Sequence, residues 1–432
     1  MRIVYDLFIS LYLFSIKTAS LIGNEKAKLW VSGRKNCIKN LEEALKDFKG
    51  KERFWFHCAS LGEFEQGRAL IEKVREEYPD SFILLTFFSP SGYEIRKNYK
   101  EVNFVSYLPM DTRNNASKFV NILNPTKTFF IKYEFWFNYI NELNKKKQSV
   151  YIVSAIFRPQ QIFFKWYGVF FREMLKIITH IFVQDKNSFR LLKEAGISNS
   201  SISGDTRFDR VEKVAKESLR NDKIEEFIGK NKSIIAGSTW PEDEELLLST
   251  YYSLDESNLK LLFVPHEVTV KRIEELKKTI SKQIKSKEIA LYSDEKLNTK
   301  AEIMIIDTVG LLSSAYAYAT LAWVGGGFGK GIHNILEPAA HGKPILFGPE
   351  YSKFKEAHDL ITKRSAYSIS DSVIAKRVIN KLLSNQDQLK SSGAASAEYV
   401  KENTGATNMI FEFVFKKTGK KQKPGQQQII EY

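Results

Sequence analysis

Short apolar runs alternate with amphipathic stretches from about residue 53 to residue 195, and the alternation starts again near residue 233. Strand–helix alternation of this kind predicts a parallel sheet covered by helices on both faces. Because the chain has 432 residues, which is longer than one hydrophobic core usually supports, two domains are expected. The predicted fold class is therefore α/β, with two Rossmann-like, doubly wound domains in tandem that face an interdomain cleft.

The apolar runs place the strands and the domain boundaries. Strands are expected at 54–57, 82–86, 104–107, 128–131, 150–153, 181–183, 233–236, 259–264, 289–292, 302–305, 321–324 and 344–347. The intervening helices include 163–177, 310–317 and 334–341. The predicted organisation is an amino-terminal segment at 1–23, a first domain at 24–208, a linker at 209–232, a second domain at 233–402, a helix at 403–415, and a basic, disordered tail at 416–432.

The amino-terminal segment, residues 3–23, is about as long as the roughly 20 residues that span a bilayer. Asp6 and Lys17 interrupt it, and it lacks the small-residue cleavage site of a signal peptide. Basic residues follow it directly, which by the positive-inside rule places the rest of the chain in the cytoplasm. Three alternatives are open: a spanning anchor, a helix lying in the membrane interface, or an ordinary helix packed on the first domain.

The charge balance limits the classes of partner. The chain has 65 Lys and Arg against 51 Asp and Glu, a net charge of +14, and its mean hydropathy of −0.29 excludes a polytopic membrane protein. No nucleic-acid-binding module or basic cluster with interleaved aromatic residues is present, so an anionic membrane surface and anionic substrates are the expected partners. The two cysteines, Cys37 and Cys58, cannot form a disulfide framework or a zinc site.

Ligands of doubly wound domains bind where strands end and helices begin, so the first-domain loops are candidate sites. Glu63 follows the first strand behind Ser60 and Gly62, and it can act as a general base or merely complement the helix dipole. Glu134 follows another strand, as a second acid or a helix cap. Arg207, near the domain junction, can bind an anion or form an ion pair with a neighbouring aspartate.

The second domain offers two further loops. Ser238 or Thr239 can cap a helix or help to hold an anion. Residues 325–331 contain five glycines, which indicates close approach of a ligand or unusual backbone angles. Asn334 and Glu337 lie three residues apart, on one face of the expected helix, where they can bond a ribose or a base; His333 is a structural histidine or a catalyst. No D-x-D run and no metal-ligand spacing occurs, so a reaction without metal or cofactor is expected.

Taken in order, these loops resemble those of the Kdo transferases (3-deoxy-D-manno-octulosonic acid transferases), which are inner-membrane enzymes of lipopolysaccharide assembly. The resemblance runs from the amino-terminal segment to about residue 415 and implies a GT-B fold. The residues that carry it are Ser60-Leu61-Gly62-Glu63, Glu134-Phe135-Trp136, residues 204–209, Asp307-Thr308-Val309-Gly310, and Gly325-Gly326-Gly327 with His333-Asn334-x-Leu336-Glu337.

The resemblance implies a donor, CMP-Kdo, and an acceptor, the lipid A precursor (a tetraacyldisaccharide 1,4'-bisphosphate), at the cytoplasmic face of the inner membrane. It implies inverting transfer with Glu63 as the general base, and residues 403–415 crossing back onto the first domain. The acceptor side would comprise Ser60, Gly62, Glu134 and Arg207, and the donor side Ser238, Thr239, His266, Val309, Gly310, Leu311, Gly326, Gly327, His333, Asn334 and Glu337.

The chain departs from the family pattern in places. His266 stands where the family often has the arginine of P-R-H, and Leu311 stands where it has the glutamate of M-G-E. Two other functions remain to be separated from Kdo transfer. One is another GT-B enzyme, either a nucleotide-sugar transferase or an epimerase. The other is a non-catalytic protein that binds lipid surfaces or nucleic acid.

Overall fold

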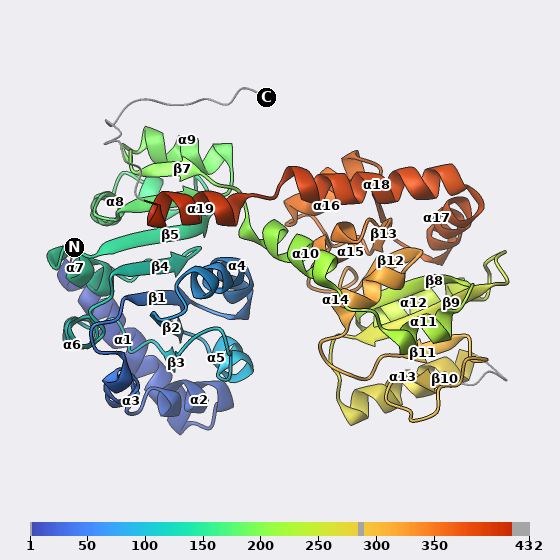
Figure 1. Cartoon of the computed structure of the whole chain (residues 1–432), viewed down its shortest axis with the longest axis horizontal. Coiled ribbons are helices and arrows are strands. Elements are labelled where there is room, and N and C mark those ends of the chain that lie inside the picture. Colours follow the sequence, from blue (N-terminus) through green and yellow to red (C-terminus); the bar gives the residue numbers. More distant parts are fainter. Residues whose placement is uncertain (1, 284–288, 417–432) are drawn as a thin grey trace. The chain divides into compact units, whose positions relative to one another are not determined.

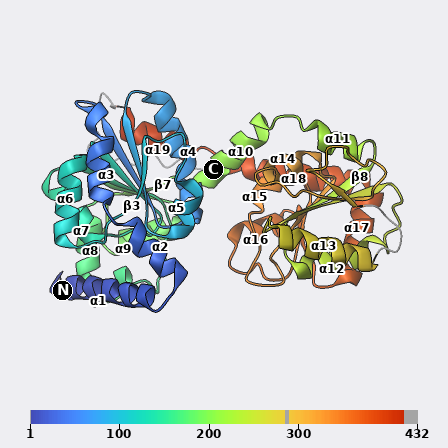
Figure 2. The same ribbon diagram turned by 90° about the horizontal axis from the view of Figure 1, so that it is seen from below.

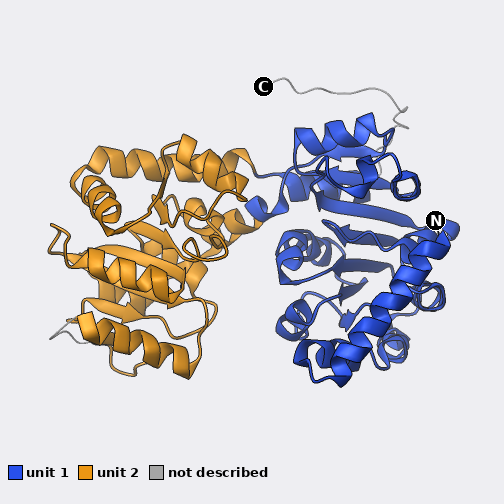
Figure 3. Cartoon of the chain, turned by 180° about the vertical axis from the view of Figure 1, so that it is seen from behind, with its two compact units in different colours: residues 1–209, 404–432 blue, residues 210–403 orange. Residues whose placement is uncertain are grey.

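The computed structural model describes residues 2–283 and 289–416. This part of the chain forms two compact units (Figure 3), the first reaching to Asp209 and including the segment from Thr404, the second running from Arg210 to Asn403. In each unit a parallel sheet, seven-stranded among the described residues, carries helices on both faces (Figures 1 and 2). The predicted class, α/β with two doubly wound domains, is confirmed.

The first sheet has the strand order β3-β2-β1-β4-β5-β6-β7. Its strands are β1 (Arg53–Cys58), β2 (Phe82–Phe87), β3 (Phe104–Tyr107), β4 (Lys127–Ile131), β5 (Ser149–Ala155), β6 (His180–Val183) and β7 (Ser200–Ile202). The helices are α1 (Arg2–Leu21), α2 (Glu25–Gly33), α3 (Cys37–Ala44), η1 (Lys46–Phe48), α4 (Leu61–Glu77), α5 (Pro90–Arg96), α6 (Arg113–Leu123), α7 (Phe137–Lys145), η2 (Ile162–Phe164), α8 (Val169–Lys176), α9 (Lys186–Glu194) and α19 (Ala406–Phe415). Helix α10 (Thr206–Glu217) begins in the first unit and continues into the second.

The second sheet has the order β10-β11-β9-β8-β12-β13-β14. Its strands are β8 (Lys232–Thr239), β9 (Leu259–Pro265), β10 (Ile289–Leu291), β11 (Ile303–Ile305), β12 (Leu321–Val324), β13 (Ile345–Phe347) and β14 (Ala366–Ser368). The helices are α11 (Asp222–Ile228), α12 (Pro241–Tyr251), α13 (Val270–Gln283), α14 (Leu312–Ala315), η3 (Tyr316–Tyr318), α15 (Leu336–Ala340), α16 (Lys355–Thr362), α17 (Ser372–Ser384) and α18 (Gln386–Glu402).

The strand order reverses direction at one point in each sheet. In the first sheet β1 lies between β2 and β4, and in the second β8 lies between β9 and β12. The chain therefore leaves the two adjacent central strands toward opposite sides, and the loops that follow them diverge. Such a topological switch point is where open α/β sheets bind their ligands.

Helix α19 joins the first unit although it ends the described chain. Its residues Ile410, Phe411 and Val414 are buried in the core layer that also holds Phe54 and Phe129 of β1 and β4. The carboxylate of Asp209 accepts hydrogen bonds from the backbone N–H of Gly405 (2.6 Å) and of Thr407 (2.9 Å) and from the Thr407 hydroxyl (2.9 Å). The start of α19 is thus fixed to the first unit by Asp209, the residue at which the first segment of that unit ends.

Several elements differ from the sequence-based expectation. The edge strands β7 and β14 were not predicted, because neither has an apolar run. The helix expected at 163–177 is divided into η2 and α8 at Gly168, where a Cβ atom would lie 1.9 Å from the carbonyl oxygen of Ile162. The tail expected to be disordered lies outside the described residues beyond Lys416.

The expected linker, 209–232, is helical for most of its length. It contains most of α10 and all of α11, and Ile224, Phe227 and Ile228 of α11 are buried in a core layer of the second unit. The reason is that this mostly charged segment carries a few apolar residues at helical spacing, which is enough to pack one face of a short helix.

Helix α1 meets the length and composition of a membrane span, with a mean hydropathy of 1.3 over its apolar window, of which 6% is buried. It lies along the surface of the first unit (Figure 2). The Tyr5 hydroxyl donates to Asp111 (2.5 Å), Asp6 forms an ion pair with Arg113, and Ile9 is buried. The large apolar residues that remain exposed on or just after α1 are Ile3, Val4, Leu7, Phe8, Leu11, Phe14, Leu21 and Ile22.

The glycine-rich loop after β12 packs backbone to backbone against two other loops. A Cβ atom on Gly325 would lie 2.3 Å from the carbonyl oxygen of Ser238, and one on Gly327 would lie 2.5 Å from the amide nitrogen of Gly348. These glycines therefore join the loop after β12 to the end of β8 and to the loop after β13, so part of the glycine pattern is explained by packing rather than by a ligand.

Replacing Gly327 by alanine is expected to destabilise the second unit by about 1–3 kcal/mol, because the new methyl group overlaps backbone atoms. The matched control is Gly329→Ala, whose Cβ atom would lie 3.8 Å from its nearest neighbour; its effect should stay within about 0.5 kcal/mol. Urea unfolding of the two variants gives the comparison. Equal destabilisation would show that the loop can move to accommodate the methyl group.

Stability should also fall as the pH falls below 6.5, in part because of His180. Burial lowers the pKa of His180 to about 4, and its ring contacts Phe182 of β6 and Phe413 of α19. The unfolded chain binds the proton below about pH 6.5 while the folded chain resists it, so this stability is complete above 6.5 and is lost toward pH 4. His180→Phe should therefore lose less stability between pH 7 and pH 4.5 than the unchanged protein.

Urea unfolding at both pH values measures this difference, and His358→Gln on the exposed side of α16 is the control that should behave like the unchanged protein. The same loss of stability on acidification in the His180→Phe protein would contradict the assigned role of His180.

Candidate functional site

The switch point of the first sheet brings together the loops that follow β1 and β4. The two strands pair in parallel, with His57 opposite Phe130, so their carboxyl ends lie side by side. Glu63 belongs to the loop and helix start after β1, and Glu134 belongs to the loop after β4. The two acids predicted from the sequence are therefore both at the point where this fold binds ligands.

Glu63 lies in the first turn of α4 and is partly exposed. The hydroxyl of Ser60, the residue just before the helix, donates to the carboxylate of Glu63. Ser60 has extended backbone angles and its side chain bonds no helix amide, so this hydroxyl is committed to Glu63 rather than to capping. Gly62 is exposed, and a Cβ atom on it would lie 3.8 Å from Oγ of Ser60. The result is an oriented, solvent-accessible carboxylate at a helix amino terminus.

Glu134 is 9% exposed and belongs to a buried network that the sequence analysis did not find. Its Oε2 atom lies 3.1 Å from Nε2 of His57 and 2.7 Å from the indole nitrogen of Trp136. His57 is fully buried, and its Nδ1 atom lies 2.8 Å from the hydroxyl of Thr86 on β2. The sequence does show His57 as a titratable residue near the end of an otherwise apolar strand. Its partner Glu134, however, lies 77 residues away along the chain.

Arg207 pairs with Asp205. Its Nε and terminal nitrogen each lie 2.8 Å from Oδ2 of Asp205, and Asp209 instead holds the start of α19. Of the two alternatives for Arg207, the structure shows the ion pair with a neighbouring aspartate. Asp205 is buried, whereas the Arg207 side chain is 29% exposed.

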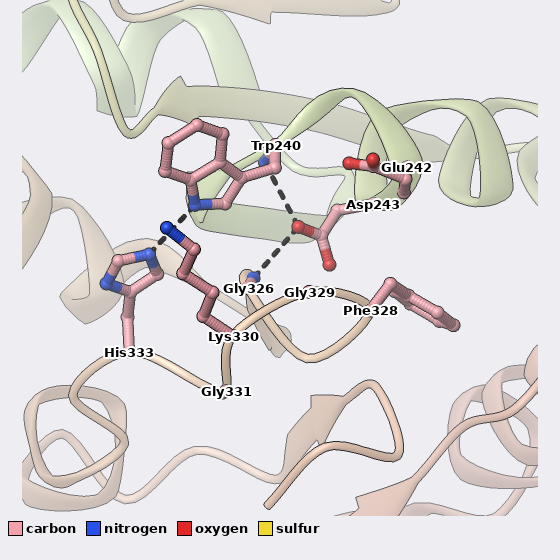
Figure 4. Close-up of a pocket in the computed structure, with 9 residues that line it drawn as sticks. All are labelled: Trp240, Glu242, Asp243, Gly326, Phe328, Gly329, Lys330, Gly331 and His333. Atoms are coloured by element: carbon pink, nitrogen blue, oxygen red, sulfur yellow. Dashed lines mark hydrogen bonds between the residues drawn. The ribbon is translucent and has the colours of Figure 1, made fainter.

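The switch point of the second sheet carries a pocket of about 380 Å³ (Figure 4). Trp240, Glu242 and Asp243 come from the start of α12, after β8, and the rest of the lining comes from the loop after β12. The lining residues are Trp240, Glu242, Asp243, Gly326, Phe328, Gly329, Lys330, Gly331 and His333. Of the predicted donor-side residues, Gly326 and His333 are therefore in this lining.

Asp243 is the residue that fixes the two sides of this pocket to each other. It is fully buried, and its Oδ2 accepts the backbone N–H of Trp240 (3.0 Å) and of Gly326 (2.9 Å), while Oδ1 accepts the indole N–H of Trp323 (3.2 Å). Burial raises the pKa of Asp243, and the backbone hydrogen bonds oppose that effect. The acid thus serves the scaffold, and no pattern in the sequence distinguished it from its exposed neighbour Glu242.

Ser238 and Thr239 do not cap α12. Its N-cap residue is Trp240, whose backbone N–H donates to Asp243. Thr239 is buried and donates to Glu244 (2.8 Å), which also pairs with Arg272. Ser238 has a φ of 53°, a left-handed conformation, at the end of β8. Ser238 contacts Gly325 of the glycine-rich loop, and Gly327 of the same loop packs against Gly348.

An aromatic stack stands at the edge of the pocket. The ring of His266 lies 4.9 Å from that of Trp240 and 4.3 Å from that of His333, near parallel to both. The Trp240 indole N–H donates to Nε2 of His333 (3.1 Å). Burial, and next the neighbouring His266, lower the pKa of His333 to about 4. His333 is therefore neutral at pH 7, and Lys330 is the charged residue of the lining suited to an anion.

The remaining predicted residues lie outside the pocket lining. Val309 is 80% exposed, Gly310 has a φ of 93°, and Leu311 precedes the short helix α14. Asn334 precedes α15 rather than lying on it, so the expectation of a shared helix face is wrong. Its side-chain amide still donates to Glu337 (3.0 Å).

A search for clusters of three or more His, Cys, Asp or Glu side chains that could hold a metal ion found none among the described residues. Both cysteines are free and buried.

Comparison with known proteins agrees with this arrangement. Residues 34–210 match the family model described as 3-deoxy-D-manno-octulosonic-acid transferase (kdotransferase). The chain is 28% identical to a 3-deoxy-D-manno-octulosonic acid transferase of Rickettsia felis over 84% of this chain and 78% of the relative. It is 25% identical to that of Rickettsia bellii over 96% and 99% of the two chains.

Among solved structures, the UDP-GlcNAc 2-epimerase of Neisseria meningitidis aligns with a TM-score of 0.59 at 13% identity, covering 83% of this chain and 98% of that one. At this identity the likeness shows the fold, which is of the GT-B type, and nothing of the substrate. The family model and both relatives carry the name of a 3-deoxy-D-manno-octulosonic acid transferase, so these matches support a glycosyltransferase. By its first-domain match and by similarity along nearly its full length, this chain resembles the 3-deoxy-D-manno-octulosonic acid transferases.

Proposed function

We propose that this chain transfers Kdo from CMP-Kdo to the lipid A precursor, a tetraacyldisaccharide 1,4'-bisphosphate, with inversion at the anomeric carbon and without a metal ion. The observation that carries the proposal is the position of Glu63. It is a partly exposed carboxylate, oriented by Ser60, at the switch point of the domain that matches the family model.

In the proposed reaction Glu63 removes the proton from a primary hydroxyl of the acceptor. The hydroxyl oxygen then forms a bond to the anomeric carbon of Kdo, and the bond from that carbon to the phosphate oxygen of CMP breaks. The electron pair leaves with CMP through an oxocarbenium-like transition state, as in glycoside chemistry generally. Because attack comes from the face opposite CMP, the configuration inverts.

The first unit would hold the acceptor and the second unit the donor. The stacked rings of Trp240, His266 and His333 suit a planar base, and Lys330 suits the phosphate of CMP. His266 would then take the place of the family's arginine as a weaker donor, and Lys330 would supply the permanent charge. On the acceptor side the positive charge of Arg207, whose side chain is 29% exposed and pairs with Asp205, suits an anionic group of either sugar.

Glu63→Gln is expected to lower kcat by about 100- to 10,000-fold, because the amide cannot accept the proton. The control is Glu65→Gln two residues further along α4, where the acid pairs with Arg96 and Arg68; it should change kcat only a few-fold. The assay incubates CMP-Kdo with the lipid A precursor, with and without EDTA, and identifies the product by mass spectrometry.

Retention of full turnover by the Glu63→Gln protein would refute the assignment of the base, and loss of activity in EDTA would refute a metal-free reaction. A panel of UDP-sugars in the same assay separates Kdo transfer from the activity of another GT-B transferase or an epimerase. The proposal requires that CMP-Kdo alone gives product.

We further propose that the enzyme works at the cytoplasmic face of the inner membrane, with α1 lying in the interface. The helix presents large apolar side chains outward while Tyr5 and Asp6 hold it to the first unit. Trp166, which is 88% exposed, lies in the segment before α8, and α8 contacts α1 through Phe170 and Tyr5. Exposed aromatic residues of this kind are typical of the headgroup region.

A second pocket, of about 370 Å³, lies beside α1 and α2. Its lining includes the basic residues Lys17, Arg34 and Lys35 and no acidic residue. Burial lowers the pKa of Arg34 to about 9, and its guanidinium donates to the carbonyl oxygens of Trp30, Phe88 and Leu108. The positive lining supports contact with an anionic lipid surface.

The double change Lys17→Glu with Lys35→Glu should weaken binding to vesicles rich in phosphatidylglycerol by about 10-fold or more, since each basic residue near the surface contributes about 1 kcal/mol. Lys278→Glu with Lys282→Glu, on the exposed side of α13, is the matched control. Vesicle sedimentation at low and high salt measures the binding. An equal loss in the control would show that net charge, and not this face, determines binding.

A further inference from the structure

We propose that His57 is a positioning residue for the acid Glu134: as an imidazole protonated on Nε2, it donates to one carboxylate oxygen of Glu134 and leaves the other free for a sugar hydroxyl. The inference rests on the proposed function for what Glu134 binds. The hydrogen-bond arrangement itself stands on the described geometry alone.

The network runs through the interior of the first unit, from β2 to the loop after β4. His57 and Thr86 are fully buried, on the adjacent strands β1 and β2. Both ring nitrogens of His57 have partners: Nδ1 lies 2.8 Å from Oγ1 of Thr86, and Nε2 lies 3.1 Å from Oε2 of Glu134. The ring therefore connects a neutral hydroxyl on one side with a carboxylate on the other.

A count of donors assigns the proton of His57. The indole N–H of Trp55, which can only donate, lies 2.8 Å from Oγ1 of Thr86, so the hydroxyl accepts there. The single hydroxyl hydrogen of Thr86 then goes either to Nδ1 of His57 at 2.8 Å or to the carbonyl oxygen of Phe56 at 3.3 Å. The shorter contact favours Nδ1 as the acceptor. Nε2 consequently carries the proton and donates to Glu134.

The second donor to Glu134 is Trp136. Its indole nitrogen lies 2.7 Å from Oε2 of Glu134 and 3.1 Å from Nε2 of His57. An N–H cannot donate to a nitrogen that is itself protonated, so the hydrogen of Trp136 goes to the carboxylate. The ring of Trp136 is fixed in turn by stacking on Phe88 at 4.8 Å. Oε2 thus receives two N–H donors held by rigid rings.

The arrangement leaves the other oxygen of Glu134 available. No residue in the described part of the chain donates to Oε1, and this atom is not among the buried polar atoms that lack a partner. Two N–H donors favour the charged form of a carboxylate. A neutral His57 provides one of them without placing a second charge in the interior, where charges are costly. Oε1 is therefore presented as an oriented acceptor at the switch point of the sheet.

The assignment of the proton can be tested without an activity assay. Nitrogen-15 NMR of the full-length protein labelled at its six histidines should show, for His57, a protonated Nε2 and an unprotonated Nδ1 at neutral pH. The signal is assigned by its loss in His57→Gln. Protonation of both nitrogens would instead indicate a buried ion pair, and protonation of Nδ1 alone would indicate the opposite tautomer. Either result overturns the proposal.

Two substitutions of His57 by amides of different side-chain length test the positioning role. In His57→Gln the carboxamide nitrogen can replace Nε2 as a donor to Glu134, whereas in His57→Asn the amide is too short. His57→Asn should lower kcat/KM by about 10- to 100-fold, as loss of an orienting partner typically does, and His57→Gln should restore most of that loss. Equal losses in both variants would overturn the proposal.

Combination with Glu134→Gln distinguishes positioning from a general structural effect. If His57 acts through Glu134, His57→Asn should cause almost no further loss of kcat/KM in the Glu134→Gln protein, because residues that act as a unit are not additive. Independent, multiplying losses would overturn the proposal. If His57→Asn fails to fold, Thr86→Val is the second variant: it removes the hydroxyl that donates to Nδ1, so the signal of the unprotonated Nδ1 should shift while Nε2 stays protonated. An unchanged His57 spectrum in this variant would count against the proposal.

The outcomes also separate this inference from the proposed function. If the unchanged protein does not use CMP-Kdo, the function is wrong while the NMR result for His57 still decides the hydrogen-bond assignment. If Kdo transfer is observed and His57 is protonated on Nδ1, the function stands and the positioning role fails.

Discussion

The reversal of strand order at the centre of each sheet is the constraint on which the sites depend. Because β1 is flanked by β2 and β4, and β8 by β9 and β12, the loops after the paired central strands leave toward opposite faces. That divergence keeps side chains from closing over the carboxyl ends of these strands. Glu63 and Glu134 in the first unit, and Trp240 and the glycine-rich loop in the second, occupy these positions.

The two units hold their acids differently at the same point of the sheet. In the first, the acids face outward or are held by neutral donors, as Glu63 is by Ser60 and Glu134 by the Trp136 indole. In the second, Asp243 is buried, and its carboxylate oxygens accept hydrogen bonds from two backbone amides and an indole. The first arrangement suits proton transfer and recognition of hydroxyl groups. The second suits an anionic, planar ligand held by backbone, aromatic rings and a surface cation.

The sequence was sufficient for the fold class and for placing the candidate loops at the ends of strands, because buried parallel strands are long apolar runs and their loops are rich in small and polar residues. It was not sufficient where partners are distant in sequence or local pattern is absent. His57 could not be matched to Thr86 and Glu134 without the strand register, and Asp243 could not be told from Glu242 without knowing which face of α12 is buried. The glycines at 325 and 327 have a packing role that composition alone cannot reveal.

The central claim is that the acceptor alcohol reacts beside the helix start at residue 63. The most direct measurement is an experimental structure of the slowed Glu63→Gln protein with both CMP-Kdo and the lipid A precursor bound. The account predicts a primary hydroxyl of the acceptor within hydrogen-bond distance of the side chain at 63, with the anomeric carbon of Kdo beyond it. A structure in which both reacting groups meet elsewhere, with residue 63 in contact with neither, would contradict it.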